Sequence, residues 1–577
     1  MKRKILLLST IVAILSSCLN EKNESYTTTD NYFQDVNQIM TGINGCYNSL
    51  RNIYSARGFW EMTDIANDLM FTSSSSLYNS NCDVSPARPG IASTVWRYGY
   101  TGVKDANEMT AAIKAAVENE NITQEQALPL YAETAVMRAM YYYLLTSTFG
   151  DVPFYSERVT EENREKIATL PRMSAIETRD YCIAELKDLL LDQKALPLTR
   201  TYEGNDYRAG AAVGFVLGAK MCMWNERWED ALEFLTALEG IYGYYEFSPE
   251  SFGVDYPLSD VPFAKRYVKE SIFEMANVVE AYGLQTSAMI AACCLPSRVA
   301  NSVIENALAS DDEGETEDEY TEEDGELLED NTGSDCYAGI RIPALGGNSR
   351  TSATARPTTY LYTRLLPYAS ADLRSGEYSN GSGQKRGGSG TLAWRWEGYD
   401  PINDPKNDSL SVMFFWTSNS SKTKLKATDR PWMGNKFWAY EMYNTKDPNN
   451  YKIFRFADVL LMKAEALLRS GQHESACRYL NVTRVRAGLE QLTYASVGSE
   501  PEALMEEIRM ERAKELVGEF HRKFDLVRWG IWYERTVAYN EGSYLKDYIR
   551  PYHRYWPIPA DQVAYSGYAL DNNEYLE

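Results

Sequence analysis

Cys18 is the side chain best placed for covalent chemistry, because of the residues that precede it. A basic start is followed by a short apolar run over residues 5–15, and then by Ser16 and Ser17. An apolar run of this length is too short to span a bilayer as a helix and is typical of an export signal. Small residues before a cysteine match the bacterial lipobox, in which removal of residues 1–17 leaves the thiol free for diacylglyceryl attachment. The sequence predicts a chain anchored to a membrane by lipid, and the alternative is an ordinary signal with a chance cysteine.

Aromatic side chains are the second group of functional candidates, because they could bind a ligand. The chain holds 42 Tyr and 12 Trp, many of them in stretches without a helical pattern. Each combines a flat apolar face with a polar group, which suits sugar rings and protein interfaces. The same side chains also fill protein cores, so their number alone does not decide between the two roles.

Acidic residues outnumber basic ones and give a net charge of −23, which disfavours binding to nucleic acid or to an anionic membrane. Residues 311–330 concentrate this charge, since more than half of them are Asp or Glu. Mutual repulsion and the lack of apolar anchors predict a solvated loop there. Structural calcium is the alternative, but the ordered Asp-x-Asp-x-Asp-Gly spacing is absent.

Residues for enzyme chemistry are sparse. The three histidines, His473, His521 and His553, are far apart, and no cysteine pair has metal-ligand spacing, so the sequence disfavours a zinc hydrolase. Asp64 and Asp68 could be imagined as the acid and nucleophile of a glycosidase, but 81 acidic residues offer many chance pairs. We therefore expect no enzyme, no catalytic residue, no metal site and no cofactor.

Helical patterns supply the scaffold. Apolar residues recur at three- and four-residue intervals over residues 36–53, 127–148 and 175–191. Two pairs of adjacent helices, at 209–224 with 228–238 and at 456–470 with 473–485, combine small and large residues like tetratricopeptide units. The pairs are irregular and far apart. The sequence predicts a mainly α fold built as an irregular tetratricopeptide-like superhelix.

The middle of the chain differs from the rest in composition and in helical periodicity. Between residues 240 and 450 the helical pattern loosens, and Gly, Ser, Asn and aromatic residues dominate. Long irregular segments mounted on a helical scaffold are where binding function usually resides.

Three cysteines, Cys182, Cys222 and Cys477, lie among apolar residues of predicted helices, where a buried thiol is expected.

A series of short motifs resembles the SusD/RagB family of Bacteroidetes outer-membrane nutrient-binding lipoproteins. No single motif is decisive, but their order and number along nearly the whole mature chain match. The series comprises Ala132-Glu133, Arg138-Ala139, Tyr141-Tyr142, FGDVP at 149–153, ESIFE at 270–274, RFADVLLM at 455–462, NVTRVRAG at 481–488 and WPIP at 556–559. It also includes Glu511, Arg512, Glu515, Glu519, Arg522, Asp525 and Arg528, whose spacing allows opposite charges to meet and fix helix register. One departure is the end of the chain, LDNNEY at 570–575, where the family often has a Gln-Asn-Pro-Gly-Tyr-like segment.

The resemblance implies a domain plan, a location and a function. Residues 18–240 would form an N-terminal helical region, and residues 241–577 a loop-rich C-terminal region containing the acidic block. The lipid at Cys18 would hold the chain on the outer membrane, and Glu21 and Glu24 resemble the signal that directs such lipoproteins to the cell surface. There the protein would bind oligosaccharide or polysaccharide and deliver it to a SusC-like TonB-dependent transporter.

The resemblance also directs attention to particular aromatic and basic residues. In related proteins the ligand site lies in loops between the early helices and in the irregular middle region. Here the corresponding candidates are Tyr78, Arg88, Trp96 and Tyr98 in the first region and Tyr282, Tyr337, Trp394 and Trp396 in the second. Two alternatives stay open, a peptide- or other nutrient-binding member of the same family and a helical-repeat scaffold that binds only proteins.

Overall fold

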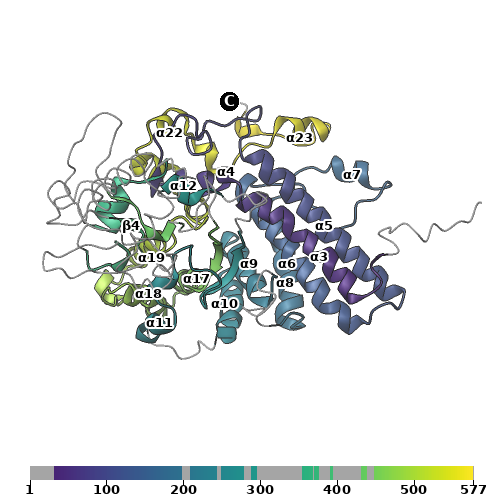
Figure 1. Cartoon of the computed structure of the whole chain (residues 1–577), viewed down its shortest axis with the longest axis horizontal. Coiled ribbons are helices and arrows are strands. Elements are labelled where there is room, and N and C mark those ends of the chain that lie inside the picture. The colour runs from purple at the N-terminus through teal and green to yellow at the C-terminus, as the bar shows by residue number, and fades with distance from the viewer. Residues whose placement is uncertain are drawn as a thin grey trace, which may run out of the picture.

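The long helices follow one another in space as they do along the chain. The structure is a computed structural model that describes residues 32–197, 208–242, 249–277, 288–294, 354–367, 370–375, 390–393, 431–437, 439 and 448–575 (Figure 1). Each long helix packs against the next, from the N-terminal side of the molecule to the C-terminal side. These helices are α3 (Val36–Tyr54), α5 (Ala92–Glu118), α6 (Gln124–Phe149), α8 (Ala175–Leu186), α9 (Ala211–Trp224), α10 (Trp228–Tyr242), α17 (Phe456–Arg469), α18 (His473–Arg486) and α19 (Pro501–Glu515).

The two predicted helix pairs are confirmed. They are α9 with α10 and α17 with α18, and within each pair the two helices pack side by side. The structure adds that α10 packs against α17, so the two pairs, distant in sequence, are neighbours in one helical layer. The fold is therefore mainly α and tetratricopeptide-like, as predicted. The predicted boundary at residue 240 falls within the last turn of α10.

Helix α5 was not among the predicted helices, although it is the longest in the described part of the chain. It contains Gly99 and Gly102, which weaken a helical pattern when the sequence is read alone. At Gly102 the reason is close packing, because a Cβ atom there would lie 2.1 Å from the ring of Tyr141 in α6. Trp96 and Tyr98 therefore lie on a helix and not in a loop.

Shorter elements connect and cover this layer. Short helices are α4 (Arg57–Trp60), α7 (Arg164–Ala168), α11 (Pro249–Asp255), α12 (Ile290–Cys294), α20 (Arg522–Arg528), α21 (Trp532–Tyr539), α22 (Ser543–Tyr548) and α23 (Ala560–Tyr565), and π-helical turns occur at Glu61–Ile65, Lys187–Asp192 and Leu361–Leu365. Three antiparallel strand pairs join distant segments: β1 (Met70–Phe71) with β3 (Arg356–Pro357), β2 (Ser271–Met275) with β6 (Tyr451–Arg455), and β4 (Leu392–Ala393) with β5 (Trp432–Met433). In Figure 1, α22 and α23 lie along the upper edge of the molecule, with α23 above the end of α5.

A buried network of charges fastens the C-terminal helices to the segments around them. The carboxylate of Glu515 accepts hydrogen bonds from Arg455 at 2.7 Å and from Arg374 at 2.9 Å, and it also pairs with Arg486. All four side chains are at most 1% exposed. The charged C-terminal residues are paired and buried, as predicted, but within the predicted set only Asp525 pairs, with Arg512 and with Arg528. Most partners come from other elements, so the network fixes tertiary arrangement more than helix register.

The apolar interior is continuous across most of the helical layer. Helix α6 is buried on all sides over its C-terminal half, since α5, α3, α8 and α9 all pack against it. Cys182, Cys222 and Cys477 are buried free thiols, as predicted. Within the described ranges, no helix is both long enough and apolar enough to cross a membrane.

Candidate functional site

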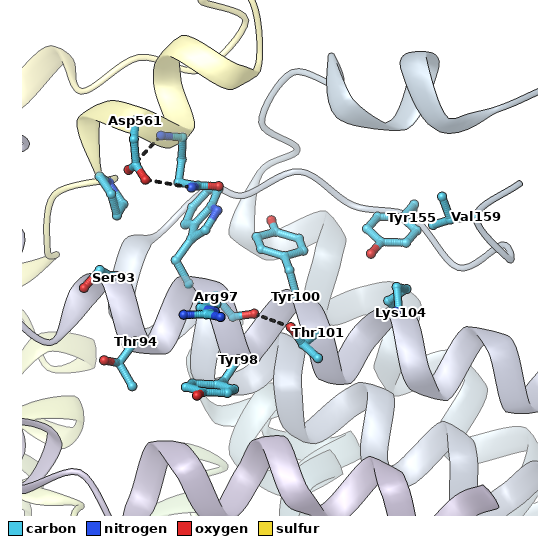
Figure 2. Close-up of a pocket in the computed structure, with 13 residues that line it drawn as sticks. Ser93, Thr94, Arg97, Tyr98, Tyr100, Thr101, Lys104, Tyr155, Val159 and Asp561 are labelled. Atoms are coloured by element: carbon cyan, nitrogen blue, oxygen red, sulfur yellow. Dashed lines mark hydrogen bonds between the residues drawn. The ribbon is translucent and has the colours of Figure 1, made fainter. Parts of the chain in front are cut away.

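A hollow of about 730 Å³ runs beside α5, bounded by that helix, by the segment after Pro153 and by the start of α23 (Figure 2). Side chains of three segments that are far apart in the sequence meet there. We call it the α5 hollow, and its lining consists of Ser93, Thr94, Trp96, Arg97, Tyr98, Tyr100, Thr101, Lys104, Tyr155, Val159, Pro559, Asp561 and Gln562.

Three aromatic rings form one continuous side of the α5 hollow. The rings of Tyr100 and Tyr155 are nearly parallel, at 8° with centroids 6.4 Å apart, and the centroid of the Trp96 ring lies 4.9 Å from that of Tyr100. Trp96 is only 5% exposed, because its ring also meets Phe149 edge-on at 5.1 Å. The tyrosines therefore offer more ring surface to a ligand than the tryptophan does.

The turn after α6 brings Tyr155 to this position. Gly150 caps the helix with a φ of +73°, a left-handed conformation that favours glycine, and a Cβ atom there would lie 3.1 Å from the ring of Tyr555. The chain then turns back, and Tyr100 donates a hydrogen bond to the carbonyl of Pro153 at 2.8 Å. The FGDVP motif thus sets the path of the segment that carries Tyr155.

Both phenols of this side stay neutral at physiological pH. Burial raises the pKa of Tyr155 to about 12 and holds the pKa of Tyr100 well above its usual range. Neutral phenols and flat rings can contact the apolar face of a polar ligand and bond its hydroxyl groups. The site has the composition of a binding surface for ring-shaped polar molecules.

A polar stripe on α5 lies along the other side of the hollow. Arg97, Thr101 and Lys104 are spaced four and three residues apart, which places them on one face of the helix. Arg97 is exposed, and the side chain of Lys104 is 57% exposed. Across the hollow, the side-chain amide of Gln562 donates to the carboxylate of Asp561 at 3.2 Å. Figure 2 shows Asp561 on α23, on the opposite side from the two cations of α5.

Tyr78 and Arg88 lie in the loop that leads into α5. The guanidinium of Arg88 lies 4.6 Å from the centre of the Tyr78 ring, which is 39% exposed, and it pairs with Asp83 at 2.6 Å. The loop is tied to α23, because the amide of Ala560 donates to the carbonyl of Pro86 at 2.9 Å. The four predicted residues of the first region therefore form two sets, Trp96 with Tyr98 in the hollow and Tyr78 with Arg88 in the adjoining loop.

The other predicted features lie outside the described residues. These are Cys18, Tyr282, Tyr337, Trp394, Trp396 and the acidic block 311–330.

Sequence analysis did not identify several lining residues. Tyr155 lies two positions after the FGDVP motif, and this closeness to the motif could have identified it from the sequence. The stripe formed by Arg97, Thr101 and Lys104 would have been visible only if α5 had been recognised as a helix. Asp561 and Gln562 come from the far end of the chain, and nothing in their local sequence indicates that they face α5.

The acidic pair considered as glycosidase residues has a structural role. Asp68 accepts hydrogen bonds from Arg522 at 2.8 Å and from Arg535 at 3.1 Å, while Asp64 accepts from the amide of Phe520 at 2.9 Å. Both carboxylates are 0% exposed, so no substrate reaches them. Among the described residues no group of three or more His, Cys, Asp or Glu side chains is arranged to hold a metal ion.

The chain matches family models at both ends. Residues 303–576 match the model described as the SusD family, and residues 17–209 match a model described as starch-binding, associating with outer membrane. SusD-like protein P25 of Formosa agariphila is 23% identical over 575 residues, which cover 96% of this chain and 94% of that protein.

Solved structures share the fold over almost the full length. A SusD superfamily protein from Bacteroides vulgatus has a TM-score of 0.64 at 16% identity, covering 94% of this chain and 100% of that one. Surface glycan-binding protein A from Bacteroides thetaiotaomicron, in complex with laminarihexaose, has a TM-score of 0.64 at 19% identity, covering 93% and 99%. These likenesses show the fold, and the two model matches, at residues 17–209 and 303–576, show that the chain belongs to the SusD/RagB family.

Proposed function

We propose that this protein is a lipid-anchored protein of the outer-membrane surface that binds oligosaccharide or polysaccharide and delivers it to a SusC-like TonB-dependent transporter. The α5 hollow is the observation that carries the binding step. It combines the parallel rings of Tyr100 and Tyr155 with hydroxyl, amide and cationic groups in one concave surface.

Sugar recognition requires this combination of groups. The C–H faces of a sugar ring stack on aromatic rings, and its hydroxyl groups need donors and acceptors at the edges of the stack. Ser93, Thr94 and Thr101 supply hydroxyl groups on α5, and Gln562 supplies an amide from α23. The exposed Tyr78 ring in the adjoining loop is a further surface on which a longer glycan can continue.

The relatives support the ligand class and the location. One structural neighbour is a surface glycan-binding protein in complex with laminarihexaose, and one matching family model is described as starch-binding and associating with outer membrane. The N-terminal signal ending at Cys18 is consistent with lipid anchoring in that membrane.

Calorimetric titration of the mature chain tests the binding step. We expect heat of binding with at least one member of a panel of polysaccharides and none with a digest of peptides. Tyr155→Ala should weaken binding about fivefold or more, the usual scale for removing a stacked ring. Tyr548→Ala, which removes an exposed ring of α22 outside the hollow, is the matched control. Heat of binding with peptides alone would show a peptide-binding member of the family. No heat of binding with either ligand class would favour a protein-binding scaffold.

Affinity isolation tests the delivery step. The tagged full-length chain should be isolated from its native outer membrane together with a TonB-dependent barrel, identified by mass spectrometry. Isolation without any barrel would contradict delivery and leave glycan binding unaffected.

A further inference from the structure

The α5 hollow carries positive charge that its own carboxylate does not balance. Arg97 and Lys104 both line it from α5, and Asp561 is the only acidic side chain among the described residues that line it. Asp561 lies on α23 across the hollow, where it accepts hydrogen bonds from the backbone and side-chain amides of Gln562 at 2.9 and 3.2 Å. The hollow is therefore locally cationic in a protein whose net charge is −23.

Neighbouring acids leave Arg97 unpaired in the described part of the chain and pair with Lys104 at long range. Within the described part of the chain, no carboxylate lies within 4.0 Å of the Arg97 guanidinium, which instead lies 5.7 Å from the centre of the Tyr98 ring. Lys104 forms an ion pair with Asp105 at 3.7 Å, and both side chains of this pair are partly exposed, at 57% and 33%. Glu108, one turn further along α5, is paired with Arg158 at 2.9 Å. A ligand can therefore bind Arg97 directly and can compete with the long, exposed pair of Lys104.

The spacing of the cations matches a repeating ligand. Arg97 and Lys104 are seven residues apart on one helix, so they are separated by about 10 Å along the axis. This separation is on the scale of the disaccharide repeat of a linear polysaccharide. Thr101 lies between them, and the aromatic rings of Tyr100 and Tyr155 lie beside them. If a sugar chain stacked on the rings carries acidic groups on alternate residues, two of those groups would lie near the two cations.

We propose, on the basis of the proposed function, that the α5 hollow selects an anionic glycan, one that carries carboxylate or sulfate groups. Arg97 and Lys104 bind the acidic groups, and the tyrosine rings bind the sugar faces. Charge-assisted hydrogen bonds to guanidinium and ammonium groups are stronger than the neutral bonds that a neutral glycan would make at these positions. The paired cations therefore determine specificity, while the aromatic side provides affinity for glycans in general.

Titration of the mature chain with hexasaccharides of equal length tests this inference. The probes are laminarihexaose as the neutral ligand, a galacturonate hexasaccharide for carboxylate and a carrageenan hexasaccharide for sulfate. We expect one of the anionic probes to bind at least about tenfold more tightly than the neutral one at low salt. Raising the salt concentration to about 0.5 M should remove most of that difference, because exposed charges are then screened. The anionic probe that binds more tightly than the neutral one shows whether the preferred acidic group is carboxylate or sulfate.

Variants separate specificity from folding and from glycan binding in general. Arg97→Gln combined with Lys104→Gln should abolish the preference for the anionic probe, whereas Arg97→Lys should keep most of it. Lys114→Gln removes an α5 cation outside the hollow, whose side chain is 72% exposed, and should leave binding unchanged. Equal or tighter binding of the neutral probe, abolished by Tyr155→Ala, would overturn the inference and keep the proposed function. Binding of no glycan at all would overturn both.

Discussion

The hydroxyl group of Tyr142 joins the backbone of Tyr155 at two points. It donates a hydrogen bond to the Tyr155 carbonyl at 2.7 Å and accepts one from the Tyr155 amide at 2.9 Å. Tyr142 belongs to the buried part of α6 and has no exposed surface, whereas Tyr155 lines the α5 hollow. A core residue therefore positions a residue of the candidate site, and the two tyrosines connect folding to binding.

Tyr142→Phe tests this connection. The substitution removes both hydrogen bonds and leaves the Tyr155 backbone groups without that partner, so we expect the free energy of unfolding to fall by about 1–3 kcal/mol. Glycan affinity should fall as well, because the Tyr155 ring is no longer held parallel to Tyr100. Denaturant unfolding and calorimetry measure the two effects. Tyr143→Phe is the control, since the Tyr143 hydroxyl makes no hydrogen bond within the described residues.

Trp96→Ala should act on stability more than on ligand stacking. Trp96 is 5% exposed and packs on Phe149 and Tyr100, so its removal leaves a cavity between α5 and α6. We expect a loss of about 3–5 kcal/mol in the free energy of unfolding. Tyr98→Ala, at a half-buried position of the same helix, should change stability by far less. Equal stability of both variants would show that Trp96 is not a packing residue.

Acid should destabilise the protein through the buried network around Glu515. Burial opposes ionisation, but Arg486, Arg455 and Arg374 hold the pKa of Glu515 well below its usual range, and Arg374 and Lys514 lower the pKa of Glu511 to about 2. Because these pKa values are lower in the folded state than in the unfolded chain, the stabilisation is complete above about pH 5. It is lost as pH falls from there toward 2. Denaturant unfolding at a series of pH values should show this decline.

A single substitution checks the role of Glu515 at neutral pH. Glu515→Gln removes the charge that three buried arginines share, and we expect the free energy of unfolding to fall by about 3–5 kcal/mol. Glu507→Gln on the same helix is the control, because its half-exposed ion pair with Arg484, at 3.7 Å, should contribute less than about 1 kcal/mol. A comparable small effect for both variants would contradict the importance of the network.

Asp64 should give the opposite pH dependence. Burial raises the pKa of Asp64 to about 7, so between about pH 4 and pH 7 the folded state keeps a proton that the unfolded chain releases. This contribution to stability therefore decreases as pH rises through that window and is constant above it. Asp64→Asn keeps an oxygen to accept from Phe520 and Thr63 but cannot titrate. His521 and His553, whose pKa values burial lowers, act in the opposite direction in the same window, so the comparison between the two proteins carries the test. Between pH 5 and pH 8 we expect the free energy of unfolding of the variant to fall less, or rise more, than that of the unaltered protein, and identical slopes would refute this assignment.

Cys18→Ser should release the protein from the membrane. A serine cannot accept the diacylglyceryl group through a thioether, so the tether that the N-terminal signal predicts would not form. Fractionation of cells followed by immunodetection measures the distribution. Ser17→Ala keeps a small residue before the cysteine and should leave the protein in the membrane fraction. Unchanged recovery of Cys18→Ser with the membrane would count against lipidation.

Much of the scaffold could be predicted from the sequence because its determinants are local. The pairs α9 with α10 and α17 with α18 carry apolar residues at helical intervals, and Gly150 and Pro153 mark the end of α6. Each of these signals acts within a few turns of chain, where hydrogen bonding and side-chain periodicity decide the structure. The charged residues around Glu515 could likewise be expected to be paired and partly buried, but their spacing did not indicate that Arg374, Arg455 and Arg486 are the partners of Glu515.

The candidate site depended on the tertiary structure because its parts come from distant segments. Gly102 weakens the helical pattern of α5 in the sequence. In the structure it leaves room for the ring of Tyr141, which packs against it from α6. Asp561 and Gln562 reach the hollow only through the path of the C-terminal chain, which no local pattern encodes. The sequence by itself determined that paired helices form and that aromatic and charged residues abound. Only tertiary packing decided that Trp96 is buried and that Tyr155 meets Tyr100, since burial and ring contacts depend on neighbours far away in the chain.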